Sequence, residues 1–87
     1  MRPVSRPRLR RSEAPKSAIR VALGDAIRAV RREQGHSQEG LAARVGLDRS
    51  YYSAIERGEY KASIDTFGKI ACGLDVTLSE LLGRAGL

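Results

Sequence analysis

The sequence predicts an all-α fold, a compact domain of five helices preceded by a disordered basic N-terminal arm. From Ala18 onward, apolar residues recur three or four positions apart, which is the spacing of one helix face. Residues suited to helix N-caps precede these segments, and glycines follow most of them. No segment shows the sustained apolar–polar alternation that indicates a strand. The 87 residues are enough for one small domain.

The arm comprises residues 1–17 and the domain residues 18–87. All three prolines and few apolar residues lie in the arm, which also carries most of the net charge of +6. Such a segment buries too little apolar surface to offset the entropy lost on ordering. Three interpretations remain open. It could be an inert solubilising extension, an electrostatic arm along DNA phosphates or in a minor groove, or a stretch upstream of the true start.

The first helix is expected to begin near Ala18. Leu23, Ile27 and Val30 fall on one face and form an apolar stripe. Gly35 follows the last turn and is expected to end the helix.

The segment from Ser37 to Gly58 has the form of a helix, a tight glycine turn and a second helix. Ser37 and Asp48 have side chains suited to N-caps, and Gly46 adopts a left-handed turn at little cost. The inner faces are expected to contain Leu41, Ala42, Val45, Tyr52 and Ile55. This is the plan of a helix-turn-helix, in which the second helix projects into the DNA major groove.

Two further helices complete the prediction. Ser63 is expected to begin the fourth, and Thr77 with Glu80 has the spacing of a capping box at the start of the fifth. The apolar side of the fourth helix is expected to contain Ile64, Phe67, Ile70 and Ala71.

Composition excludes several kinds of site. A single cysteine, Cys72, and a single histidine, His36, form neither an internal disulfide nor a paired metal site. No arrangement suited to catalysis or to a phosphate-binding loop is present, so we expect no enzyme, no cofactor, no metal and no small-molecule ligand. No membrane span or signal peptide is evident, and a cytoplasmic location is expected.

Residues 22–83 resemble the Cro/CI-type helix-turn-helix family, the Xre-like regulators of phages, plasmids and bacterial chromosomes. Three stretches match the family pattern in order: "LGDAIRAVRREQGHSQEGLA", "RSYYSAIERGE" and "SIDTFGKIACGLDVTLSELL". Within the family, the chain is similar to the controller proteins of restriction–modification systems. The resemblance implies a lambda-repressor-like domain and a bacterial transcription regulator, such as a repressor, acting on nucleoid DNA.

The resemblance also assigns roles to individual residues. Base-contacting positions correspond to Asp48, Arg49, Ser50 and Ala54. Phosphate-contacting positions correspond to Ser37, Gln38, Tyr51, Arg57 and Lys61. Arg31 and Glu56 correspond to a partly buried ion pair between the first and third helices.

Physical arguments bear on some of these assignments. Arg49 at a helix N-terminus has the reach and the fork geometry to bind guanine O6 and N7. Beside DNA, Asp48 would be repelled unless it accepts from a cytosine amino group or pairs with Arg49, and we favour a cap that pairs with Arg49. Gln38 remains open as a solvated first-turn residue, and Tyr51 as an exposed aromatic without a task.

The chain departs from the family pattern in two places. Gly40 lies inside the second helix, where it costs about 0.5–1 kcal/mol relative to a good helix former. Cys72 and Gly73, in the stretch "ACGL", stand where the family usually has longer or more helical residues.

The C-terminal segment has more apolar residues than docking one short helix requires: Val76, Leu78, Leu81 and Leu82. In the family this region commonly forms a two-fold dimer interface. A homodimer would bind a palindromic operator with half-sites about 34 Å apart. Sequence-specific regulation by a DNA-bound dimer is therefore the favoured function. The alternative is a protein-interaction module, such as an antitoxin or partner subunit, and an enzyme is third.

Overall fold

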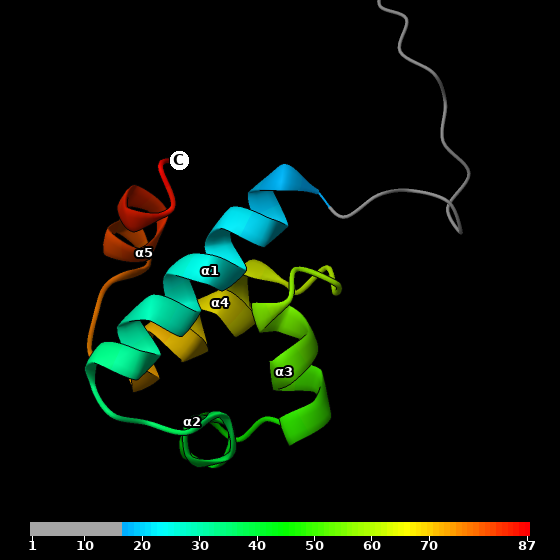
Figure 1. Cartoon of the computed structure of the whole chain (residues 1–87), viewed down its shortest axis with the longest axis vertical. Helices are drawn as coiled ribbons and strands as arrows, with labels where there is room; N and C mark the ends of the chain where they lie inside the picture. Colours follow the sequence, from blue (N-terminus) through cyan, green and yellow to red (C-terminus); the bar gives the residue numbers. More distant parts are fainter. Residues whose placement is uncertain (1–16) are drawn as a thin grey trace, which may run out of the picture.

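The computed structural model describes residues 17–87 and contains five α-helices and no strand in that part of the chain. Their bounds are α1 Ala18–Glu33, α2 Gln38–Val45, α3 Arg49–Glu56, α4 Ile64–Gly73 and α5 Leu78–Arg84 (Figure 1). The all-α fold and its five helices are confirmed. The predicted arm falls, apart from Ser17, outside the described residues.

Each helix begins after a side chain that accepts a hydrogen bond from a free backbone N–H of the first turn. The caps are Ser17, Ser37, Asp48, Ser63 and Thr77. Four of the five were predicted, and Thr77 forms the full capping box with Glu80. The exception, Ser17, was assigned to the arm, yet its hydroxyl accepts from the amides of Ile19 and Arg20.

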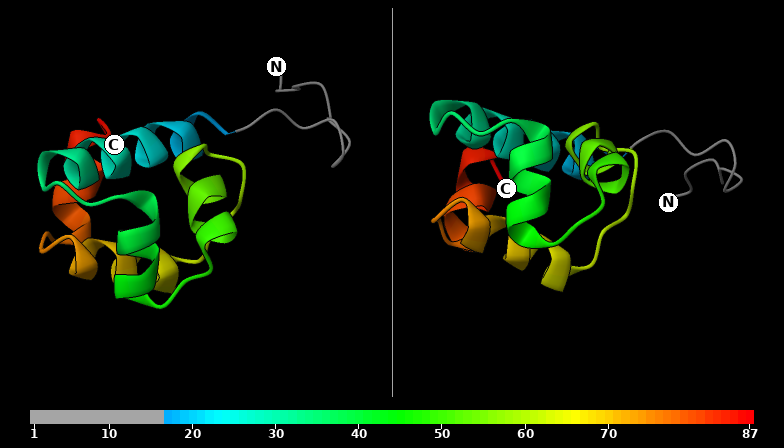
Figure 2. Two further views of the ribbon diagram at one scale, coloured as in Figure 1. Left: turned by 60° about the horizontal axis from the view of Figure 1, so that its bottom comes forward. Right: turned by 90° about the horizontal axis from the view of Figure 1, so that it is seen from below.

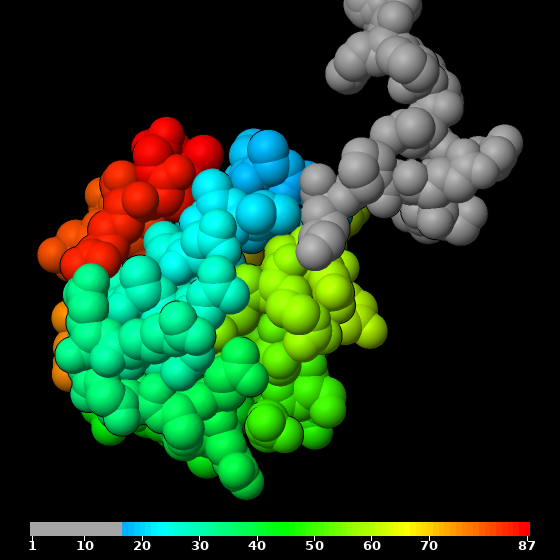
Figure 3. All heavy atoms as spheres, in the orientation of Figure 1, coloured from blue at the N-terminus to red at the C-terminus, as the bar shows by residue number. Residues whose placement is uncertain are grey.

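The main contacts between the helices form a ring, in which α1 contacts α3 and α5. α2 contacts α3 and α4, and α4 also contacts α5. In both views of Figure 2, α3 and α5 lie at opposite sides of the domain. In the space-filling view, α2 and α3 form the lower part of the surface and α5 the upper left (Figure 3). The helix-turn-helix and the C-terminal helix therefore present separate surfaces.

The core draws on all five helices. Its buried members are Leu23, Ala26, Ile27, Val30, Leu41, Ala42, Tyr52, Ile55, Ile70, Ala71, Leu74 and Leu81. One prediction was wrong: Ile64 is 71% exposed. It is the first residue of α4, where the chain enters from a surface loop, so its side chain lies beyond the packed interface.

Two glycines permit close helix packing. A Cβ atom at Gly24 of α1 would collide with the carbonyl oxygen of Glu56 and lie 2.8 Å from that of Ile55. A Cβ atom at Gly73 of α4 would collide with Cγ1 of Val45. Gly24 thus sets the distance between α1 and α3, and Gly73 that between α2 and α4. No helix within residues 17–87 has the length and apolar character needed to cross a bilayer.

Candidate nucleic-acid interface

The helix-turn-helix consists of α2, a three-residue turn and α3. Gly46 begins the turn with φ 74°, a left-handed conformation that costs glycine little. The Leu47 N–H then donates to the Ala42 carbonyl oxygen at 2.9 Å and closes the end of α2. Ala42 and Tyr52 are buried where the two helices meet, as predicted. The angle between α2 and α3 is therefore fixed by packing.

The N-terminus of α3 presents exposed polar side chains. Asp48 Oδ2 accepts from the Tyr51 N–H at 3.2 Å, and its charge is favourable at the positive end of the helix dipole. Arg49 and Ser50 are exposed. The expected Asp48–Arg49 ion pair does not form within the described part of the chain, because the Asp48 carboxylate turns back to cap the helix. The guanidinium of Arg49 can therefore reach an external partner.

Further along α3, polar side chains lie one helical turn apart on the same side. Arg49, Ser50, Ser53 and Arg57 line a shallow hollow. Arg57 donates to Ser53 Oγ at 2.7 Å and to Glu59 Oε1 at 3.0 Å, and the latter bond raises the pKa of Arg57. Ser53 was missed by the sequence analysis, although its position four residues after Arg49 could have identified it.

Ala54 does not lie where the resemblance implied. It is 4% exposed, so the base-contacting role assigned to it is not accessible in this structure. The fifth residue after Arg49 rotates toward the body of the domain, whereas the fourth, Ser53, stays on the hollow. We therefore leave Ala54 out of the proposed contacts.

An aromatic pair borders α3. The half-buried Tyr51 packs against the core, and its ring meets that of Tyr60 edge to face at a centroid distance of 5.6 Å. Lys61 follows and is exposed. Tyr51 lies in the first turn of α3, so its contact with Tyr60 brings the segment that follows α3 back toward the start of that helix.

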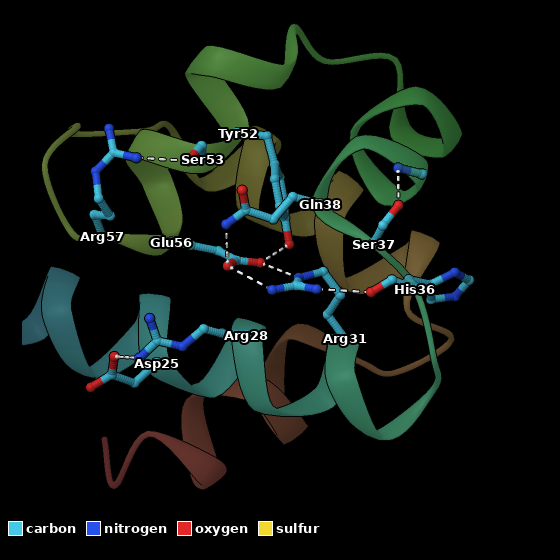
Figure 4. A network of polar contacts seen from close by, with 11 residues as sticks. Asp25, Arg28, Arg31, His36, Ser37, Gln38, Tyr52, Ser53, Glu56 and Arg57 are labelled. Carbon is cyan, nitrogen blue, oxygen red and sulfur yellow. Dashed lines mark hydrogen bonds and ion pairs between the residues drawn. The ribbon is translucent and has the colours of Figure 1, made fainter.

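Behind α3 lies a buried polar network, shown in Figure 4. Arg31 Nε and Nη2 donate to the Glu56 carboxylate at 2.6 and 3.2 Å, and the Tyr52 hydroxyl donates to Glu56 Oε2. Gln38 Nε2 donates to Glu56 Oε1 at 2.9 Å. One carboxylate therefore accepts from α1, α2 and α3 together.

The network explains the protonation state of its members. Burial favours the neutral form of Glu56, but the donors Arg31, Tyr52 and Gln38 outweigh it and lower its pKa. Burial and the neighbouring Glu56 charge raise the pKa of Tyr52, so its hydroxyl keeps its proton. The network thus contains an ionised acid, a cation and two neutral donors.

The entry to α2 is tied to the same network. Arg31 Nη1 donates to the His36 carbonyl oxygen at 2.8 Å, one residue before the cap Ser37. Ser37 Oγ accepts from the Gly40 N–H at 2.9 Å. The assigned phosphate contacts Ser37 and Gln38 are thus held by a cap and by a buried acid.

The C-terminal apolar residues divide into two groups. Leu81 was expected to contact a second subunit. It is 0% exposed and belongs to the core, so its side chain is not available for that contact. Val76, Leu78 and Leu82 are half-buried at the surface. Of these three, Val76 lines a shallow groove together with Val30, Glu80, Leu81 and Arg84. Within residues 17–87, no cluster of His, Cys, Asp and Glu could hold a metal ion.

Known proteins share both the sequence and this architecture. Residues 27–81 match the helix-turn-helix family HTH_3. The control protein C.MunI of Mycoplasma sp is 44% identical over 64 residues, spanning 72% of this chain and 86% of that protein. The restriction-modification controller protein C.AhdI from Aeromonas hydrophila has a TM-score of 0.72 and 42% identity, over 75% of this chain and 98% of that one. The clp gene regulator ClgR from C. glutamicum has a TM-score of 0.78 and 28% identity, over 85% of this chain and 95% of that one.

Proposed function

This chain belongs to the helix-turn-helix family and is a DNA-binding transcription regulator, and we propose that it binds a palindromic operator as a homodimer. The observation that carries the proposal is the exposure of Arg49 and Ser50 at the start of α3, on a helix whose angle to α2 is fixed by packing. A rigid helix with an exposed N-terminus is what the major groove accommodates.

Base contacts come from the start of α3 in this proposal. Arg49 binds guanine O6 and N7, which discriminates against other bases by about 1–3 kcal/mol. Ser50 is small and can donate to or accept from a neighbouring base edge. Asp48 acts chiefly through its cap, because its carboxylate already accepts from the Tyr51 N–H.

Phosphate contacts flank the base contacts and fix the position of the domain without selecting sequence. The proposed contacts are Ser37, Gln38, Tyr51, Arg57 and Lys61. Arg57 would exchange or share its bond with Glu59 on meeting a phosphate. The Tyr51–Tyr60 pair would form a rigid wall at the groove edge.

The homodimer interface is proposed at Val76, Leu78 and Leu82, which are half-buried in α5 and the segment just before it. α5 lies on the side of the domain away from α3 (Figure 2). A two-fold axis there would direct two copies of α3 toward successive major grooves. The similarity to controller proteins supports regulation within a restriction–modification system in the bacterial cytoplasm.

Selection of binding sites from a random duplex library, at about 150 mM salt because phosphate contacts weaken steeply with salt, tests this proposal. We expect an enriched palindrome with one fixed half-site spacing, and a dimer by light scattering in the presence of the selected duplex. An enriched single half-site would overturn the dimer. Recovery with no enriched sequence would overturn specific binding and favour the protein-interaction alternative.

A further inference from the structure

The Glu56 carboxylate is inaccessible to DNA yet is bound directly to a proposed phosphate contact. Its side chain is 1% exposed, and its Oε1 accepts from Gln38 Nε2 at 2.9 Å. Gln38 is the first residue of α2, and Glu56 is the last residue of α3. The bond therefore links the start of the helix-turn-helix to its end, two points that are too far apart in the sequence for a local interaction.

The carboxylate is itself immobile. Arg31 donates to both of its oxygens and Tyr52 to one of them. Arg31 is in turn anchored on the His36 carbonyl oxygen, just before α2. An acceptor held by donors from two other positions can orient a flexible side chain that binds to it.

The charge of Glu56 decides which way the Gln38 amide turns. An ionised carboxylate only accepts hydrogen bonds, so the amide must direct its NH₂ group inward and not its oxygen. One of the two N–H bonds of Nε2 is used on Glu56, and the other remains for an external acceptor. The amide is therefore fixed in one of two otherwise similar orientations.

We propose that Glu56 is a positioning residue for DNA binding, which holds the Gln38 amide so that its second N–H meets a backbone phosphate. The inference rests on the proposed phosphate contact of Gln38. Without Glu56 the glutamine would sample several rotamers and both amide orientations. Its contribution to affinity would then fall by about twofold to tenfold, the cost of ordering one flexible side chain.

A double-mutant cycle on binding to a mixed-sequence DNA duplex, measured by fluorescence anisotropy with fully folded protein, tests the coupling. The four proteins are the wild type, Gln38→Ala, Glu56→Gln and the double variant. We expect Gln38→Ala to weaken binding severalfold in the wild-type background and less than twofold in the Glu56→Gln background. An equal loss in both backgrounds would overturn the positioning role.

The exposed Lys61 supplies the matched control. Lys61→Ala should weaken binding by the same factor in both backgrounds, because no bond connects Lys61 to the network among the described residues. Equal coupling of Lys61 and Gln38 to Glu56 would indicate a general structural effect and overturn the inference. If Gln38→Ala has no effect even in the wild-type background, the phosphate contact itself fails, and with it the premise.

Two further experiments test the inference if Glu56→Gln does not fold. A second background, Arg31→Met with Tyr52→Phe and Glu56→Leu, replaces the network with apolar side chains and leaves no buried charge unpaired. We expect Gln38→Ala to weaken DNA binding less than twofold in this triple-variant background as well, and a loss equal to that in the wild-type background would overturn the positioning role. In the wild type, NMR relaxation of the Gln38 side-chain amide should match that of the α2 backbone before DNA is added. An amide as mobile as in urea-unfolded protein would overturn the inference.

Discussion

Arg31 and Glu56, which are 25 residues apart, form an ion pair with an Nε–Oε2 distance of 2.6 Å and side chains 8% and 1% exposed. The pair connects α1 to the end of α3, next to the close approach that Gly24 permits. Burial of both charges makes the pair costly to break from one side, because the remaining charge has no water to solvate it.

We expect Glu56→Gln to lower the free energy of unfolding by about 3–5 kcal/mol, because it leaves the buried Arg31 without a counter-charge. Urea unfolding at pH 7 measures the change. Asp25→Asn is the matched control, since it breaks the exposed Asp25–Arg28 pair at 2.8 Å and should cost under about 1 kcal/mol. Similar losses in the two variants would contradict the argument from burial.

Stability should also depend on pH through Glu56. Burial would raise its pKa, but the donors outweigh it, so the pKa is lower in the folded than in the unfolded state. A lowered folded-state pKa stabilises the protein above the unfolded value of about 4.3, and the gain disappears as the pH falls below it. The difference in unfolding free energy between wild type and Glu56→Gln should therefore narrow from pH 5 to pH 3. A difference that stays constant would argue against this titration.

Gly24→Ala should destabilise the domain by about 1–3 kcal/mol or more, because the new Cβ would collide with the Glu56 carbonyl oxygen and separate α1 from α3. Gly68→Ala is the control within a helix. Nothing lies within 4 Å of a Cβ there, so helix propensity alone should stabilise α4 by about 0.5–1 kcal/mol. Thermal unfolding measures both variants. We expect the melting temperature to fall for Gly24→Ala and to rise for Gly68→Ala, and a change of the same sign in both would contradict the argument from the Cβ contacts.

Gly73→Ala should be destabilising for a different reason, since its Cβ would collide with Cγ1 of Val45. Shortening that neighbour should restore space, so Val45→Ala should cost less in the Gly73→Ala background than in the wild type. Denaturant unfolding of the two single variants and the double variant gives the coupling. Additive losses would mean that the two positions do not share this contact.

Arg49→Ala should reduce discrimination at one base position of each half-site by about 1–3 kcal/mol. Gln38→Ala should instead weaken binding to every duplex by a similar factor, as expected of a phosphate contact. Competition binding with single-base variants of the selected operator separates the two effects. A change of preferred base on Gln38→Ala would contradict the role assigned to it.

The helices could be predicted because their determinants are local. An apolar stripe, a cap and the glycine at a helix end act over at most four residues, so Ser37, Asp48 and Thr77 mark helix starts by themselves. The predicted burial of Ala42 and Tyr52 follows from the same helix periodicity. The family pattern added the Arg31–Glu56 pair, which no local pattern indicates.

The sequence by itself determined five helices, the caps of four of them and a helix-turn-helix with Arg49 at the start of its second helix. Only the tertiary structure decided that Ala54 and Leu81 are buried, that Ile64 is exposed, and that Gly24 and Gly73 stand at close approaches. It also decided that Gln38 binds Glu56. These features depend on which helices meet and at what distance, and such contacts join residues too far apart in the chain for local periodicity to relate them.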